Sequence, residues 1–169
     1  ALKRENYQRN GIKKGLTNAN PDDLILISDV DEIPNLSNLD INKVNNNIIL
    51  FKQNFYYYKF NLKLENMPWF GTKACKYKIL KSPQWLRNVK GKNYPFWRLD
   101  VLFSEKKYSN IKFINNGGWH FSNMKTPDEI EKKMRTYLHH REYDIKPLGT
   151  SKIKEIIKNK KSIYNLRAD

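Results

Sequence analysis

The sequence has a single cysteine, Cys75, which excludes an internal disulfide and a cysteine-based metal cluster. Long hydrophobic runs are also missing: stretches such as Leu24–Ile27 are far shorter than the about 20 residues of a membrane-spanning helix, and no signal peptide is recognisable. Glycine and proline, at seven each, are too few for a low-complexity chain. With 169 residues the chain can bury a real core, and we expect residues 1–169 to form a single domain.

Acidic residues are outnumbered, since 17 Asp and Glu face 32 Lys and Arg for a formal charge of +15. Such an excess suits nucleic acid, an anionic membrane surface or a phosphorylated substrate. The lysines are spread along the whole chain among many asparagines and isoleucines, a mixture that an AT-rich coding sequence also produces. The charge by itself therefore does not select a function.

One stretch combines a buried strand with acidic residues. The four apolar residues Leu24–Ile27 predict a short strand buried on both faces, as in a parallel sheet. Asp29, Asp31 and Glu32 follow before Pro34, and ligands of open α/β sheets bind outside the carboxyl ends of the strands. Two carboxylates at this spacing suit a hard divalent cation beside phosphate oxygens. The alternative is a solvated acidic turn.

Apolar spacing and turn residues predict the other elements. Thr126, Pro127 and Glu129 form the pattern of a capped helix start. We expect helices over 2–16, 36–44, around 85–86, from 126 to about 140 and after Thr150 or Ser151, strands over 48–58, 72–80 and 111–114, and a loop over 61–69.

Two basic residues, a histidine and a lysine, are further candidates. His120 follows Gly117-Gly118-Trp119, where glycines allow close approach of a ligand, and a neutral imidazole there can complete the coordination of an ion held by the two aspartates. A buried histidine bonded in a turn is the alternative. Lys125 precedes a helix start, where phosphates bind well, although a solvated lysine accounts for it equally.

The segment Tyr94–Asp100 joins an acid to an aromatic wall, which can raise the pKa of Asp100 and suit it to accept a proton. A structural salt bridge to Arg98 or Arg87 is the alternative. Several rings would serve as stacking platforms for sugars or bases, unless alternate members of the tyrosine run lie in the core: Tyr56, Tyr57, Tyr58, Trp69, Trp85 and Trp97.

Taken together, these segments resemble glycosyltransferase family 17, whose animal members are β-1,4-mannosyl-glycoprotein 4-β-N-acetylglucosaminyltransferases. The resemblance spans nearly the whole chain, and the combination of D-V-D-E-I-P with G-G-W-H-F-S is more specific than either motif. The matching segments, in family order, are Arg4–Asn10 with Lys14–Leu16, Asp22–Asp23, Asp29–Pro34, Phe96–Asp100, Gly117–Ser122, Thr126–Pro127, and His140 with Glu142–Asp144 and the closing basic helix.

The resemblance implies an α/β fold of the GT-A nucleotide-sugar type, with a mixed central sheet and flanking helices. Family members carry a further N-terminal region that builds much of the nucleotide-base pocket. By this comparison the fold is N-terminally incomplete, and the chain is a fragment or a shortened, inactive form.

The resemblance also implies inverting transfer of N-acetylglucosamine from UDP-GlcNAc to a glycan acceptor, with Mn²⁺ or Mg²⁺ as the cation. The implied metal ligands are Asp29, Asp31 and His120, which contact the donor diphosphate together with Lys125. Inversion needs a base, for which we choose Asp100 with Glu32 in reserve. The acceptor-binding candidates are Tyr57, Trp69, Trp97 and Trp119.

The expected partners are a UDP-sugar and a glycan acceptor, with no nucleic acid, and the basic surface is compatible with peripheral membrane contact. The expected compartment is the cytoplasm for a microbial or viral parent and the Golgi lumen for a eukaryotic one. Two alternatives stay open. A non-catalytic carbohydrate- or nucleic-acid-binding module would use the charge and the tyrosines, but leaves the carboxylates unexplained. A metal-dependent nucleotidyltransferase or phosphohydrolase would also use D-x-D.

Overall fold

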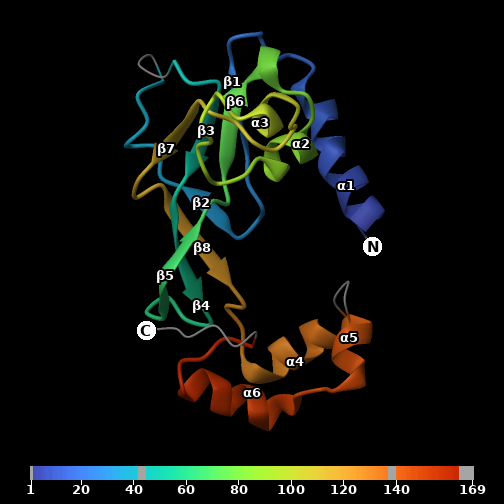
Figure 1. Ribbon diagram of the computed structural model, residues 1–169. Helices are drawn as coiled ribbons and strands as arrows, with labels where there is room; N and C mark the ends of the chain where they lie inside the picture. The colour runs from blue at the N-terminus through green and yellow to red at the C-terminus, as the bar shows by residue number, and fades with distance from the viewer. Residues whose placement is uncertain (1, 42–44, 137–139, 164–169) are drawn as a thin grey trace. The chain divides into compact units, whose positions relative to one another are not determined.

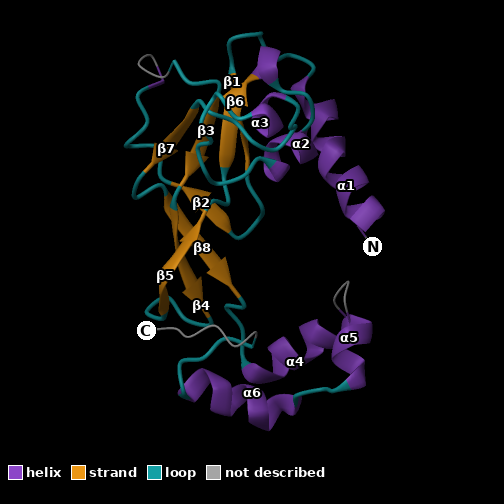
Figure 2. Cartoon of the chain, viewed as in Figure 1, coloured by secondary structure: helices purple, strands orange, loops and turns teal. Residues whose placement is uncertain are grey.

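The computed structural model describes residues 2–41, 45–136 and 140–163, which form a mixed α/β structure (Figures 1 and 2). These residues divide into two compact units. One unit comprises residues 2–53 and 68–119, and the other comprises residues 54–67 and 120–163. No helix among the described residues is long and apolar enough to cross a membrane.

The elements follow one another along the chain with short connections. They are α1 (Leu2–Asn10), the 3-10 helix η1 (Gly11–Leu16), β1 (Leu24–Ile27), β2 (Glu32–Pro34), β3 (Ile48–Phe51), β4 (Gln53–Tyr57), β5 (Lys63–Trp69), β6 (Lys73–Lys76), the 3-10 helix η3 (Tyr77–Ile79), α2 (Pro83–Asn88), α3 (Leu99–Leu102), β7 (Ile111–Ile114), β8 (Gly118–Ser122), α4 (Pro127–Thr136), α5 (His140–Ile145) and α6 (Gly149–Lys158).

The first sheet has the strand order β1-β6-β3-β7 and is mixed, because β6 runs antiparallel to both β1 and β3 while β3 runs parallel to β7. Helix α2 packs against β1 and β6, and α1 packs on α2 (Figure 1). The inward side chains of α2, Trp85 and Leu86, join Ile27 and Leu50 in the larger core cluster. Burying a side chain such as Leu86 stabilises the fold by about 1.5–3 kcal/mol.

The position of β1 corrects the expectation of a parallel strand buried on both faces. This strand lies at the end of the sheet order and pairs antiparallel with β6, and Leu24 and Leu26 are only partly buried. The fully buried strand is β3, whose four residues are all in the core. An apolar run of four residues is compatible with either place, so the sequence pattern did not distinguish them.

The second sheet has the order β2-β8-β4-β5. The strand predicted over 48–58 is two strands in different sheets, separated at Lys52, whose N–H donates to Ile114 O (3.0 Å) and whose carbonyl accepts from Gly117 N (2.8 Å). The predicted loop over 61–69 is wrong, because Lys63–Trp69 forms β5. Its Pro68 is tolerated since β5 ends the sheet order and needs no partner on its far side.

The capping box predicted at Thr126 is confirmed, whereas the cap predicted at Thr150 or Ser151 is wrong, because α6 begins at Gly149 after Leu148 and has no side-chain cap. Ser82 caps α2 by accepting from Trp85 N (3.0 Å), and Thr126 and Glu129 form the reciprocal capping box of α4. The strand over 72–80 is shorter than expected and continues as η3. The helix predicted over 36–44 is not formed by residues 35–40, while residues 42–44, like the predicted end of the helix from Thr126 at 137–139, lie outside the described residues.

Candidate active site

Three strand ends meet where the acidic turn begins. Because β6 is antiparallel to both β1 and β3, the carboxyl ends of β1 and β3 lie beside the start of β6. Thr72, just before β6, hydrogen-bonds through Oγ1 with Ser28 Oγ and accepts from Phe51 N through its carbonyl (3.1 Å). The buried amide of Gln53 accepts from Thr72 N (3.2 Å) and donates to Thr72 Oγ1 (3.1 Å). This polar junction fixes the backbone from which the turn leaves.

The acidic turn is closed by two reciprocal hydrogen bonds. Glu32 N donates to Asp29 O (3.0 Å), and Asp29 N donates to Glu32 Oε2 (2.9 Å). Val30 at the tip is fully exposed and Asp31 is partly buried. The side chain of Glu32 is completely buried, whereas 39% of the Asp29 side chain is exposed. The three carboxylates of the motif therefore have different environments, and Glu32 faces the protein interior.

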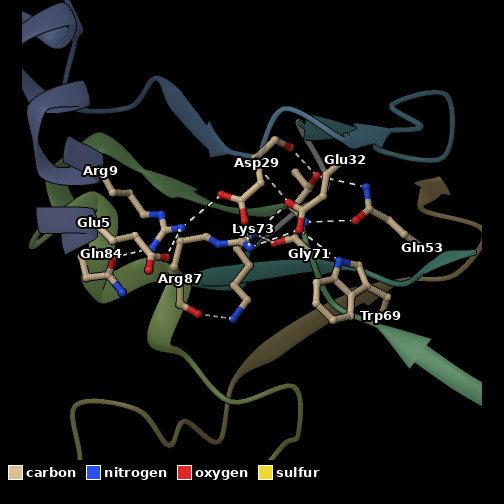
Figure 3. Close-up of polar contacts among 12 residues, drawn as sticks. Glu5, Arg9, Asp29, Glu32, Gln53, Trp69, Gly71, Lys73, Gln84 and Arg87 are labelled. Atoms are coloured by element: carbon tan, nitrogen blue, oxygen red, sulfur yellow. Dashed lines mark hydrogen bonds and ion pairs between the residues drawn. The ribbon is translucent and has the colours of Figure 1, made fainter. Parts of the chain in front are cut away.

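The guanidinium group of Arg87 on α2 joins Glu32 to Asp29 (Figure 3). Its Nη1 and Nη2 donate to Glu32 Oε2 and Oε1 at 2.8 and 3.1 Å, and Nη2 also donates to Asp29 Oδ2 at 2.7 Å. Arg87 Nη1 further donates to the carbonyl of Gly71. A planar, bidentate donor of this kind fixes geometry as well as charge. Arg87 is thus the residue that holds the turn against the helix.

A second arginine reaches the same aspartate from α1. Arg9 Nη2 donates to Asp29 Oδ1 at 3.3 Å and to Glu5 Oε1 at 3.1 Å, while its Nη1 donates to Gln84 Oε1 at 2.5 Å (Figure 3). Each oxygen of Asp29 therefore accepts from one guanidinium. The contact with Arg9 is the longer of the two and hence the weaker.

Burial of Glu32 would by itself raise the pKa of its carboxyl, but hydrogen bonds from Arg87, from the Asp29 backbone and from the Trp69 indole hold the pKa below its usual 4.5. Trp69 Nε1 lies 3.0 Å from Glu32 Oε1. Gly71 gives the carboxylate its space, since a Cβ there would lie 2.4 Å from Glu32 Cδ and 2.5 Å from Gln53 Oε1. Glu32 is consequently ionised and closely enclosed at neutral pH.

Lys73 on β6 lies next to this cluster and is only 6% exposed (Figure 3). Its Nζ donates to the carbonyls of Arg87 and Val89, both at 2.6 Å, at the end of α2. Burial and the nearby charge of Arg87 lower the pKa of Lys73 from its usual 10.5 to about 8, against a smaller opposing effect of Glu32. The ammonium group thus fixes the helix end that carries Arg87.

This lowered pKa predicts a pH-dependent stability. Between about pH 8 and 10.5 the unfolded chain keeps the Lys73 proton while the folded chain releases it, so the free energy of unfolding rises with pH. Relative to a Lys73→Met variant, wild type should gain on the order of 3 kcal/mol across this window, as one pKa unit corresponds to about 1.4 kcal/mol. Urea unfolding of both proteins at several pH values measures the difference, and a pH-independent difference would contradict the pKa.

Asp100 lies on α3 in the same unit and forms the structural salt bridge considered as its alternative. Arg98 Nε and Nη2 donate to its two oxygens at 2.8 and 3.0 Å, and Lys107 Nζ donates at 2.6 Å. These hydrogen bonds, from Arg98 first and then from Lys107, lower the pKa of Asp100 to about 2. The aromatic wall therefore does not raise this pKa, contrary to the expectation.

The residues predicted to bind the acceptor differ in how much of their rings is exposed. Trp97 is 70% and Trp119 40% exposed, so both offer ring surface. Trp69 is partly buried by its contact with Glu32. Tyr57 is buried, and its hydroxyl accepts from Asn123 Nδ2 at 2.8 Å. As the chain stands, Trp97 and Trp119 are the candidates whose rings a sugar can reach.

His120 and Lys125 belong to the other unit, so their roles as ion ligand and diphosphate contact stay predictions. His120 is buried and stacks on Phe55, with ring centroids 4.5 Å apart and planes inclined by 22°. Lys125 is exposed before α4, and its N–H donates to Asn123 O at 2.7 Å. Among the described residues, no group of three or more His, Cys, Asp and Glu side chains is arranged to hold a metal ion.

Sequence reasoning missed the basic half of the site. Arg9 was read only as part of a helix, Arg87 only as a partner for Asp100, and Gly71 and Lys73 were not singled out. A buried carboxylate needs a cation within hydrogen-bond distance, so the assignment of Glu32 to the protein interior would have been the signal to search for one.

Comparison with protein families identifies the class of this chain as that of the glycosyltransferases. The family model described as Glycosyltransferase family 17 matches residues 1–168, and the chain therefore belongs to glycosyltransferase family 17. Comparisons with curated proteins and with solved structures found no match. Family membership makes glycosyl transfer, with a sugar donor and an acceptor, the reaction class.

Proposed function

We propose that this chain contributes to the inverting transfer of N-acetylglucosamine from UDP-GlcNAc to a glycan acceptor, with the acidic turn as the donor site. The observation that carries the proposal is the turn itself. In a chain of glycosyltransferase family 17, Arg87 holds Glu32 inside and leaves Asp29 partly exposed at the strand ends. A turn that is fixed before the ligand arrives costs little to order on binding.

The carboxylate oxygens of Asp29 and Asp31 are the kind of ligand that a hard divalent cation, Mn²⁺ or Mg²⁺, prefers. Each oxygen of Asp29 accepts one guanidinium N–H, so further lone pairs are free for an ion. A cation at Asp29 competes with Arg9, whose contact at 3.3 Å is the easier one to displace. We propose Asp29 and Asp31 as ligands and His120 as the third.

The other residues of the site position Asp29 or bind the donor and the acceptor. When bound, the cation supplies a Lewis acid for the leaving diphosphate. Arg87 and Glu32 keep Asp29 in place, and Lys125 is proposed to contact the diphosphate as a point charge. Trp97 and Trp119 are proposed to stack on the acceptor sugar, which orients its attacking hydroxyl.

Asp100 is proposed as the base that takes the proton of the acceptor hydroxyl. With a pKa of about 2 it is ionised at neutral pH, but its affinity for a proton is low while Arg98 and Lys107 donate to it. An acceptor that displaces Lys107 would raise this pKa and strengthen the base. Glu32 is a poorer choice because its carboxylate is completely buried and accepts from Arg87 and Trp69.

Calorimetry of UDP-GlcNAc with and without Mn²⁺ tests the donor site. Wild type should bind only with the cation. Asp29→Asn combined with Asp31→Asn should weaken binding by more than about 100-fold, because ligand loss exceeds the 10–100-fold cost typical of residues around the ligands. The matched control, Asp22→Asn with Asp23→Asn, removes the same charge from another exposed turn and should bind like wild type.

Two results would overturn this proposal. One is unchanged affinity in the variant of the acidic turn, provided that its melting curve shows a folded protein. The other is equal binding with and without the cation. Analysis of products from UDP-GlcNAc separates sugar transfer from phosphohydrolysis, since release of phosphate without a new glycoside would indicate the second reaction.

A further inference from the structure

We propose that a groove in the unit of residues 54–67 and 120–163 binds an anionic membrane lipid. Its volume is about 1060 Å³, and it lies between the turn after β4, the segment leading into α4, and α6. Ligand pockets typically hold about 300–1,000 Å³, so the groove exceeds what a single phosphate ion would fill. The groove contains none of the residues of the acidic turn and shares only Lys125 with the proposed donor site, and the proposal does not depend on the donor sugar.

Positive charge surrounds this groove. Its lining includes five exposed lysines, Lys59, Lys125, Lys154, Lys158 and Lys160, and a single acid, Glu129. The carboxylate of Glu129 is already engaged, since it accepts from Thr126 N at 2.8 Å and from Thr126 Oγ1 at 2.9 Å. None of the five lysines forms an ion pair with another described residue. Five like charges at one groove create a potential that attracts an anion.

The walls between the lysines are apolar. Leu62, Met124 and Ile157 line the groove and are partly buried. Phe60 is 74% exposed and meets Phe121 edge to face, with ring centroids 5.2 Å apart. These apolar side chains match the hydrocarbon part of a lipid, which would remove them from water on binding. The ligand that fits both features is an anionic amphiphile.

Helix α6 brings the two features together. Ile153 is fully buried against the unit, Ile157 is partly buried one turn later, and Lys154 and Lys158 follow these isoleucines at the same i, i+4 spacing. Lysine stems can lie along apolar surface while their ammonium groups reach phosphate headgroups. Because Ile153 faces the interior of the unit, α6 offers a bound lipid Ile157 at the groove and the ammonium groups of Lys154 and Lys158.

Sedimentation with vesicles tests the proposal on the whole chain. Wild type should bind vesicles of phosphatidylcholine mixed with phosphatidylglycerol, and should bind pure phosphatidylcholine only weakly. Lys154→Ala with Lys158→Ala should weaken binding roughly 30-fold, since each lysine near an anionic surface contributes about a fivefold gain. The matched control is Lys13→Ala with Lys14→Ala, an exposed pair on η1 outside the groove, and should bind almost like wild type.

A second variant isolates the apolar part of the groove. Phe60→Ser removes an exposed ring and keeps the charge, so its defect should persist at high salt, where the contribution of the lysines is screened. UDP-GlcNAc binding by both groove variants should equal that of wild type. An equal loss of vesicle binding in the control pair would show that binding depends on the overall positive charge of the protein. Full competition by inorganic phosphate or an oligonucleotide would show that the groove binds another kind of anion. Either result would overturn the proposal.

Discussion

Arg87→Met should cost about 3–5 kcal/mol of unfolding free energy, because it leaves the carboxylate of Glu32 buried without its cation. The side chain of Glu32 is 0% and that of Arg87 12% exposed, so little water can replace the lost contacts. The variant also frees the carbonyl of Gly71 and one oxygen of Asp29. Urea unfolding followed by circular dichroism at pH 7 measures the loss.

Two further proteins show whether the buried charge is the cause. Arg135→Met removes an exposed arginine paired with Glu131 within α4 and should cost less than about 1 kcal/mol. Adding Glu32→Gln to Arg87→Met should recover part of the stability, because the uncompensated charge is gone. If Arg87→Met lost no more unfolding free energy than the Arg135→Met control, the assignment of Arg87 as the support of the turn would be refuted.

The same pair predicts how acid affects the fold. The pKa of Glu32 is lower in the folded chain than its usual 4.5, so its stabilising contribution is complete above pH 4.5 and is lost as the pH falls through the folded value. Wild type should therefore lose stability below pH 4.5 more steeply than the doubly substituted Arg87→Met, Glu32→Gln protein.

Asp100→Asn should reduce turnover by about 10²–10⁴-fold, the usual contribution of a general base, and should leave UDP-GlcNAc affinity unchanged. The amide keeps the shape of the carboxylate but cannot accept the proton of the acceptor hydroxyl. Steady-state transfer rates, measured with calorimetric donor binding on the same preparations, separate the two effects. Full turnover in this variant would exclude Asp100 as the base.

Lys107→Met controls for the loss of an ion pair. It removes one donor to Asp100, so the pKa of that carboxyl should rise from about 2 and the acidic limb of the rate profile should move to higher pH. A structural role for the salt bridge would instead lower the rate at every pH without moving the limb. The direction of this shift therefore distinguishes a base from a structural carboxylate.

Local signals in the sequence were sufficient to predict several elements. Side chains three residues apart determine the capping box of Thr126 and Glu129, so their pattern in the sequence carries the information. The acidic turn after an apolar strand was predicted for the same reason. The order of the strands was not predicted, because an apolar run such as Leu24–Ile27 can lie at the edge or in the centre of a sheet.

The partners of the acidic turn could not be predicted because they are distant in the sequence. Arg87 lies 58 residues from Asp29, and the sheet topology brings them together: β6 runs antiparallel to β1 and leads through η3 into α2. The prediction of a raised pKa for Asp100 was wrong because the burial it assumed also depends on the three-dimensional structure. Aromatic neighbours in the sequence suggested burial, but Phe96 and Trp97 are exposed and the carboxylate pairs with Arg98 instead.

The polar cluster around the acidic turn is close to neutral. Its four carboxylates, on Glu5, Asp29, Asp31 and Glu32, face the three cationic groups of Arg9, Arg87 and Lys73. A divalent ion arriving alone would leave an excess of one positive charge, and a diphosphate arriving alone would meet carboxylates. The two ligands should therefore bind synergistically, each raising the affinity for the other by the same factor.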